Sequence, residues 1–115
     1  MSESLVREMF ATIDARDWSR LDRYFTADVV YERPGYTPVS GLPALLDFYQ
    51  RTRIIAAGRH DLWQVIADGD RAACWGRFVG QSRDGAVLDE RFADVYLLVA
   101  GRIAKRSTHF FRPAI

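Results

Sequence analysis

The sequence predicts a single α+β domain, because helical patterns come first along the chain and strand patterns follow. Apolar residues keep helical spacing through most of the chain before Arg59, with one short strand among them. From Arg59 onward, strand candidates are separated by turn signals such as ADGDR, SRDG and AG. Strands and helices do not alternate as they would around a parallel sheet. With 115 residues and neither repeats nor a linker, we expect one domain, residues 1–115.

Two helices are expected before the first strand. Apolar residues repeat at helical spacing over about residues 3–15, and again from Trp18 to Phe25. Asp17 can cap the second of these helices, and residues 26–28 end it. Both helices would therefore present one apolar face to a core.

The β-branched run VVYER, residues 29–33, predicts the first strand, and a third helix follows the loop PGYTPVSG. Pro43 suits the first turn of this helix, whose apolar residues keep helical spacing until Gly58 closes it. Four further strands are expected, the last three as a meander. They cover about residues 60–67, 72–80, 87–99 and 102–111.

The charges are balanced and scattered, with sixteen Lys and Arg against fifteen Asp and Glu. This distribution lacks the basic patch of nucleic-acid-binding proteins, so we expect no nucleic-acid partner. The polar start MSESLVREMF and the absence of a long apolar stretch predict neither a signal peptide nor a membrane partner, which makes the cytoplasm the expected location. Cys74, in the apolar run AACW, is expected to be a buried thiol without a chemical role.

The order of elements resembles the ketosteroid isomerase-like superfamily, also called nuclear transport factor two-like, which includes the SnoaL-like polyketide cyclases. The resemblance rests on the segments DARDWSRLDRYFTADVVYERPG, PVSGLPALLDFYQ and FADVYLLVAGRIAKRSTHFF and covers essentially the whole chain. It implies three N-terminal helices packed in a strongly curved antiparallel sheet, forming a cone with an internal apolar pocket. It also implies a homodimer, a small-molecule substrate, and neither a metal nor an organic cofactor.

Position by position, the resemblance departs from the steroid isomerases themselves. Where they carry an aspartate base after the first strand, this chain has Arg33, and where they carry a tyrosine on the first helix it has Met9 or Phe10. Only Asp94, in FADVYLL, matches their protonated aspartate. Because that mechanism needs a base and paired oxyanion donors, we do not expect a ketosteroid isomerase.

Alternation along the strands, combined with the resemblance, predicts which side chains face the pocket. If Asp94 points inward, then Phe92, Tyr96 and Leu98 share its side. Alignment to the family also turns Trp75, Arg77 and Val79 inward on the preceding strand. On the last strand it turns Arg106, Thr108 and Phe110 inward. The full inward set comprises the charged residues Arg33, Arg77, Asp94 and Arg106, and the aromatic residues Tyr31, Phe48, Trp63, Trp75, Phe92, Tyr96 and Phe110.

This set allows two interpretations. In the functional one, an arginine pairs with Asp94 and the others bind an anionic or enolic oxygen of a small ligand. In the structural one, Arg77 and Asp94 form a cross-strand ion pair and Arg106 extends to solvent. The sequence does not say which arginine meets Asp94.

Several further residues are weaker candidates. His60 is either an acid or base at the mouth of the cone or an exposed histidine at a strand edge. Tyr31 and Tyr36 flank the Glu32 and Arg33 pair and are either hydroxyl donors at the mouth or packing residues. Glu32 should face outward, and His109 should lie on the face that forms the dimer in this family. Two distant histidines without a cluster of Cys or carboxylates predict no metal site.

The leading hypothesis is a cofactor-independent isomerase or cyclase that acts by general acid/base catalysis on a small oxygenated, anionic or polyketide-like substrate. Asp94 would transfer a proton, while Arg33 and Arg77 would orient the substrate and stabilise an enolate. One alternative is a non-catalytic small-molecule-binding or accessory dimerisation domain. Another is water activation of the kind found in the limonene epoxide hydrolases of this superfamily, which requires Asp61 or Asp89 to point inward beside Asp94.

Overall fold

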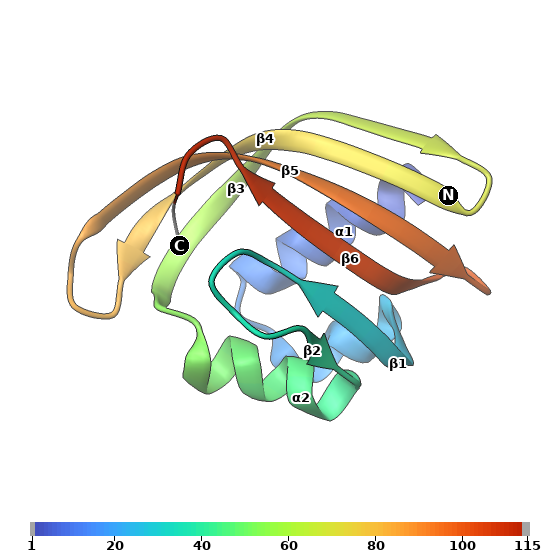
Figure 1. Ribbon diagram of the computed structural model, residues 1–115, viewed down its shortest axis with the longest axis horizontal. Helices are drawn as coiled ribbons and strands as arrows, with labels where there is room; N and C mark the ends of the chain where they lie inside the picture. Colours follow the sequence, from blue (N-terminus) through green and yellow to red (C-terminus); the bar gives the residue numbers. More distant parts are fainter. Residues whose placement is uncertain (1, 114–115) are drawn as a thin grey trace.

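Six strands form one curved sheet in the computed structural model, which describes residues 2–113 (Figure 1). The strand order is β2-β1-β6-β5-β4-β3. The strands are β1 (Phe25–Glu32), β2 (Val39–Ser40), β3 (Ile55–Asp68), β4 (Arg71–Ser82), β5 (Val87–Val99) and β6 (Arg102–Phe110).

The sheet is mixed, so the prediction of a wholly antiparallel sheet is wrong at one pairing. β3 to β6 form an antiparallel meander and β1 pairs antiparallel with β2, but β1 lies parallel to β6. Parallel partners need a long connection between them, and the helices and four strands that lie between β1 and β6 provide one. The α+β class itself is confirmed.

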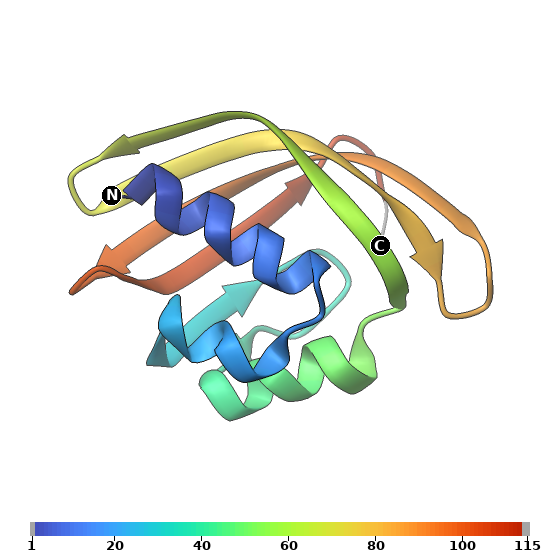
Figure 2. The same cartoon turned by 180° about the vertical axis from the view of Figure 1, so that it is seen from behind.

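One helix is long, the others are short, and the third follows the first two strands, so the prediction of three N-terminal helices is not matched. The long helix is α1 (Ser2–Asp14). η1 (Trp18–Arg23) is a 3₁₀ helix, and α2 (Leu42–Asp47) continues into the π-helical turn η2 (Phe48–Thr52). All of them lie on the concave side of the sheet (Figure 1, Figure 2).

Two predicted helix ends move because the chain joins the sheet earlier than its local pattern indicates. Phe25, predicted to be the last apolar residue of a helix, instead opens β1, where it pairs with Ile103 and is buried. The third helix ends at Thr52 rather than at Gly58, which lies within β3 opposite Gly80 of β4. An added Cβ at Gly58 would collide with the ring of Phe78, so glycine serves close packing there and not a helix end.

Strand faces follow the prediction on β5 and β6. The side chains of Phe92, Asp94, Tyr96 and Leu98 are buried, as are those of Arg106 and Thr108, while Phe110 is half-buried. Their shared inward face is confirmed.

The predicted faces of β4 are wrong. Cys74 pairs with Asp94, and directly paired residues point to the same side of a sheet, so Cys74 and Phe78 face the core. Trp75, Arg77 and Val79 then point outward and are exposed. A one-residue slip in the family alignment moves every side chain of a strand to the other face.

No helix in the described part of the chain is both long enough and apolar enough to cross a membrane.

Candidate functional site

A buried ion pair between Asp94 on β5 and Arg106 on β6 forms one wall of the site. Arg106 Nε donates to Asp94 Oδ2 at 2.8 Å, and the Tyr96 hydroxyl donates to the same oxygen at 2.7 Å. The Asp94 side chain is 0% exposed and that of Arg106 is 5% exposed. Arg106, and neither Arg77 nor Arg33, is therefore the partner of Asp94.

Arg106 connects this ion pair to a phenol. Its Nη1 donates to the Tyr49 hydroxyl at 2.7 Å, and its guanidinium carbon lies 4.6 Å from the centre of the Tyr31 ring. Burial opposes the charge of Arg106, but Asp94 and the neighbouring Tyr31, Tyr49 and Tyr96 together outweigh it and raise the pKa of Arg106 well above its ordinary value. Burial raises the pKa of Tyr49, which keeps this phenol neutral. Because the Tyr49 oxygen accepts from Arg106, its own proton is available for a further hydrogen bond.

Arg77, predicted to be catalytic, lies on the other side of the sheet. Its Nε and Nη2 donate to the two carboxylate oxygens of Asp89 at 2.7 and 2.6 Å, and both side chains are about half exposed, at 49% and 50%. Trp75 and Trp63, also predicted to line the pocket, are 40% and 50% exposed. The register of β4 explains why Trp75 and Arg77 point outward. Trp63 lies at an irregularity in the pairing of β3 with β4.

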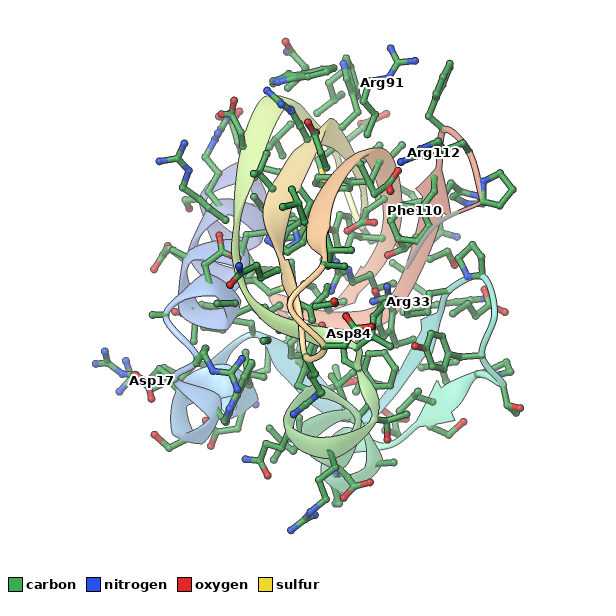
Figure 3. All side chains as sticks on the ribbon, turned by 90° about the vertical axis from the view of Figure 1, so that its left-hand side faces the viewer. Asp17, Arg33, Asp84, Arg91, Phe110 and Arg112 are labelled. Atoms are coloured by element: carbon green, nitrogen blue, oxygen red, sulfur yellow. The ribbon has the colours of Figure 1, made fainter. Side chains whose placement is uncertain are left out.

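Arg33 lies where the sequence predicts it, directly after β1 and on the inner side of the sheet (Figure 3). Its Nη1 donates to the Tyr31 hydroxyl at 3.2 Å, and that hydroxyl shares a 3.1 Å hydrogen bond with Thr108. Its guanidinium carbon also lies between 5.4 and 5.9 Å from the centres of four aromatic rings. These rings belong to Tyr31, Tyr36, Phe48 and Phe110. Glu32 turns the other way, as predicted, and pairs with Ser107 and Lys105.

His60 forms a hydrogen-bonded pair with Asp14, the last residue of α1. Its Nδ1 lies 2.6 Å from Asp14 Oδ1, and its backbone N–H donates to Asp14 Oδ2 at 2.8 Å. The His60 side chain is 11% exposed and its ring packs against Phe10, Phe78 and Phe92. The interpretation of His60 as an exposed histidine at a strand edge is therefore wrong.

The environment of His60 favours the neutral imidazole. Burial lowers the pKa of His60, although the hydrogen bond and charge of Asp14 act in the opposite direction. With the Nδ1 proton donated to Asp14, the lone pair of a neutral ring lies on Nε2. This is the form that a general base needs.

Three residues of the site carry no signal of their role in the sequence: Asp14, Tyr49 and Arg53. The local pattern marks Asp14 only as part of a helix, and its partner lies 46 residues away. Tyr49 is one of the apolar residues of the third predicted helix, and Arg53 lies inside that predicted helix. In the structure Arg53 follows η2 in an extended conformation that turns it into the core, where it is 5% exposed.

Most of these side chains line a cavity of about 20 Å³. Neither Asp14 nor Asp94 is on its wall. The polar lining residues are Tyr31, Arg33, Tyr49, Arg53, His60, Arg106 and Thr108, and the apolar ones are Ile13, Ile55, Phe78, Phe92 and Phe110. A base, hydroxyl donors and fixed cations around one small space suit the removal of a proton from carbon and the stabilisation of the resulting oxyanion.

Neither Asp61 nor Asp89 points inward. Both are exposed, and Asp89 is held by Arg77. The condition for epoxide hydrolase-like water activation is therefore not met by either residue. In the described residues 2–113, no three His, Cys, Asp or Glu side chains are grouped so that they could hold a metal ion.

A second hollow, of about 280 Å³, lies on the outer face of the sheet. Its walls include Trp63, Trp75, His109 and Phe111, so His109 lies outward as predicted. Arg91 covers the ring of Phe111 with its guanidinium carbon 3.5 Å from the ring centre.

A comparison of the sequence with models of protein families identifies the family of this chain. The sequence model of the SnoaL-like domain matches residues 6–106, which is most of the chain. The chain belongs to the SnoaL-like domain family. This SnoaL-like domain matches no curated protein in the sequence comparison.

Several solved structures have the same fold as this SnoaL-like domain. An NTF2-like protein of unknown function from Burkholderia pseudomallei K96243 has a TM-score of 0.84 at 21% identity, over 95% of this chain and 89% of the other. A proposed SnoaL-like polyketide cyclase from Shewanella denitrificans OS-217 has a TM-score of 0.81 at 13% identity, over 95% of this chain and 89% of the other. A proposed ketosteroid isomerase from Kribbella flavida DSM 17836 has a TM-score of 0.76 at 22% identity, over 99% of this chain and 80% of the other. At these identities the likeness shows the fold, whose members also include an epoxide hydrolase-like protein.

Proposed function

We propose that this SnoaL-like domain is a cofactor-independent isomerase or cyclase that uses general acid/base catalysis on a small oxygenated substrate. The observation that carries the proposal is that His60, which is held by Asp14, lines the same cavity as the Arg106 and Tyr49 pair. The fold family includes isomerases and cyclases, which supports this choice of reaction.

In this proposal His60, rather than Asp94, is the base. Nε2 of His60 takes a proton from a carbon next to a substrate carbonyl, and the electron pair of the broken C–H bond moves to the carbonyl oxygen. The imidazolium that forms is stabilised by Asp14. Return of the proton to another carbon gives an isomer, and attack of the enolate carbon on a second carbonyl gives a ring. A positioned base of this kind contributes roughly 10²- to 10⁴-fold in rate.

The developing oxyanion meets donors that are already in place. Tyr49 offers its hydroxyl proton while its oxygen accepts from Arg106, so the guanidinium makes this phenol a stronger donor. Asp94 serves as a positioning residue, because it holds Arg106 through Nε without lying on the cavity wall. Arg33 and the aromatic rings around it orient the substrate.

Hydrogen–deuterium exchange tests this function even while the natural substrate is unidentified. A panel of small oxo acids and 1,3-diketones is incubated with the protein in D₂O, and loss of the α-proton signal is followed by NMR. We expect exchange that falls roughly 10²- to 10⁴-fold in His60→Asn. The matched control is His109→Asn, which changes an exposed histidine on the outer face. Equal exchange by native protein and His60→Asn would contradict the proposal.

A second candidate is a small-molecule-binding or accessory domain without catalysis. The small cavity favours the accessory form of this candidate, because about 20 Å³ is little more than the roughly 10–15 Å³ that one water requires. Native protein that binds small oxygenated molecules but exchanges no α-proton would support this candidate over the enzyme.

We also propose a homodimer through the outer face of the sheet. Exposed apolar side chains on this face, among them Trp63, Trp75, Val95 and Phe111, support it. Sedimentation should give twice the monomer mass for the native chain, and the monomer mass for Trp75→Glu. A native chain that sediments as a monomer at all concentrations would exclude the dimer.

A further inference from the structure

Two guanidiniums on the cavity wall, those of Arg53 and Arg106, are buried, and each is positively charged at neutral pH. Arg106 pairs with Oδ2 of Asp94, while Oδ1 of Asp94 is buried without a hydrogen-bond partner in residues 2–113. Asp14 has both oxygens engaged by His60, one by the ring and one by the backbone N–H. Neither carboxylate forms an ion pair with Arg53.

Arg53 differs from Arg106 because it has no carboxylate partner in the described chain to offset its buried charge. It is 5% exposed, its side chain makes no ion pair with any carboxylate in residues 2–113, and its Nε is buried without an acceptor there. Its guanidinium packs on the faces of two rings, with the guanidinium carbon 5.1 Å from the centre of Tyr49 and 5.8 Å from that of Trp18. Burial lowers the pKa of Arg53 to about 10. An uncompensated buried cation is costly, so a protein retains one where a ligand supplies the anion.

The phenol that Arg53 packs against does not supply that anion. Burial raises the pKa of Tyr49, so it is neutral at physiological pH. The neighbouring residue Arg51 shows the contrast, because its side chain is 74% exposed and already pairs with Asp47. The exposed Arg51 thus pairs with a carboxylate of the protein, and the buried Arg53 pairs with none in residues 2–113.

We infer that Arg53 binds the carboxylate of a small organic acid that enters the cavity, and that the substrates of this domain are carboxylic acids. The inference rests on the proposed function in taking this cavity as the substrate site. A planar carboxylate matches the donor fork of a guanidinium, and its oxygens need space comparable to the cavity volume.

The position of Arg53 also defines how the acid is oriented. Its guanidinium packs against the Tyr49 ring, whose hydroxyl we assign to the reacting carbonyl. The carboxylate and that carbonyl therefore lie within a few bonds of each other, which describes a short oxo acid.

Equilibrium binding of simple acids tests the site independently of turnover. The probes are acetate and benzoate, with benzamide as the neutral counterpart of benzoate, and the measurements are thermal stabilisation and calorimetry. The native protein should bind benzoate at least about 10-fold more tightly than benzamide. Arg53→Met should weaken benzoate binding about 10- to 100-fold and leave the midpoint of the free protein unchanged or higher, because an unpaired charge is removed. Arg53→Lys should restore part of the affinity.

Arg51→Met is the matched control and should bind benzoate as the native protein does. Benzoate binding that is equally tight in Arg53→Met, or native protein that does not distinguish benzoate from benzamide, would overturn the inference. A measurement that needs no variant is the NMR signal of Arg53 Nε–H. It should shift on addition of benzoate and not of benzamide, and an unchanged signal with benzoate overturns the inference as well.

The outcomes separate this inference from the proposed function. Arg53-dependent binding of acids without any α-proton exchange retains the anion site and removes the enzyme. His60-dependent exchange combined with benzoate binding that ignores Arg53 retains the enzyme and removes the anion site.

Discussion

His60 on β3 and Asp14 at the end of α1 are joined by two hydrogen bonds, one from Nδ1 of the ring at 2.6 Å and one from the backbone N–H at 2.8 Å. The double contact holds the imidazole in one orientation and ties the long helix to the sheet. A carboxylate that orients a histidine through Nδ1 leaves Nε2 for chemistry. The pair thus combines a structural link with the best-placed base on the cavity wall.

The first prediction concerns the pH dependence that follows from His60. Its pKa is lowered from 6.5 mainly by burial, so the unfolded chain binds more protons than the folded chain below that pH. The corresponding stability is therefore fully present above about pH 6.5 and is lost as the pH falls through the lower pKa of the folded state. Thermal midpoints measured between about pH 4.5 and 8 should show this loss, and α-proton exchange should decline over the same acidic range.

The charged groups that act on His60 are Asp14, Arg106 and Asp94, with Asp14 and Asp94 opposing the shift and Arg106 assisting it. His60→Asn should flatten the decline in midpoint between pH 6.5 and the folded pKa. An identical pH profile in native protein and His60→Asn would show that the imidazole is not buried in its neutral form.

A second prediction follows from the burial of the Asp94 and Arg106 pair. Asp94→Asn removes the only carboxylate that touches the buried guanidinium of Arg106 in the described chain, and should cost about 3–5 kcal/mol in the free energy of unfolding. Urea unfolding measures this directly. The matched control lies on the same strand, because Asp89→Asn breaks an exposed pair and should change the free energy of unfolding very little. Similar losses in the two variants would mean that Asp94 is not buried with its partner.

A third prediction separates the two faces of β4. Arg77 lies on the outer face, so Arg77→Gln should leave α-proton exchange unchanged and change the free energy of unfolding very little. Arg33→Gln, on the inner side, should weaken substrate binding and therefore reduce α-proton exchange. A loss of exchange in Arg77→Gln that matches the loss in Arg33→Gln would return Arg77 to the site and contradict the register of β4 with β5.

Arg77 also illustrates how far alternation along a strand carries a prediction. On β5 the predicted inward set is correct because its polar member, Asp94, and its aromatic members share one parity. On β4 both parities contain apolar residues, Cys74 and Phe78 on one side and Trp75 and Val79 on the other. The pattern alone does not choose between them, and the family alignment is one residue out of register.

The remaining differences arise from contacts between distant segments. Nothing local marks Asp14 as the partner of a histidine 46 residues away, and nothing local ends the third helix at Thr52. That end depends on Ile55 and the following residues pairing with β4, where Gly58 permits the Phe78 ring to pack against the strand. Because the local pattern extends the helix past Arg53, it does not indicate that this arginine is buried.

The last prediction concerns Tyr49, whose hydroxyl accepts from Arg106 and can donate to a substrate oxygen. Tyr49→Phe deletes both functions while it keeps the ring that stacks on Trp18 and contacts Arg53. Loss of the buried acceptor for Arg106 Nη1 should cost about 1–3 kcal/mol in unfolding free energy. Loss of an oxyanion donor should slow α-proton exchange about 10²- to 10³-fold with little change in benzoate affinity. The control is Tyr24→Phe, whose hydroxyl accepts from Thr12 away from the cavity and should leave the exchange rate unaltered. If Tyr49→Phe exchanges protons at the native rate, the oxyanion is stabilised elsewhere, with the Tyr31 and Thr108 hydroxyls as the remaining neutral donors on the wall.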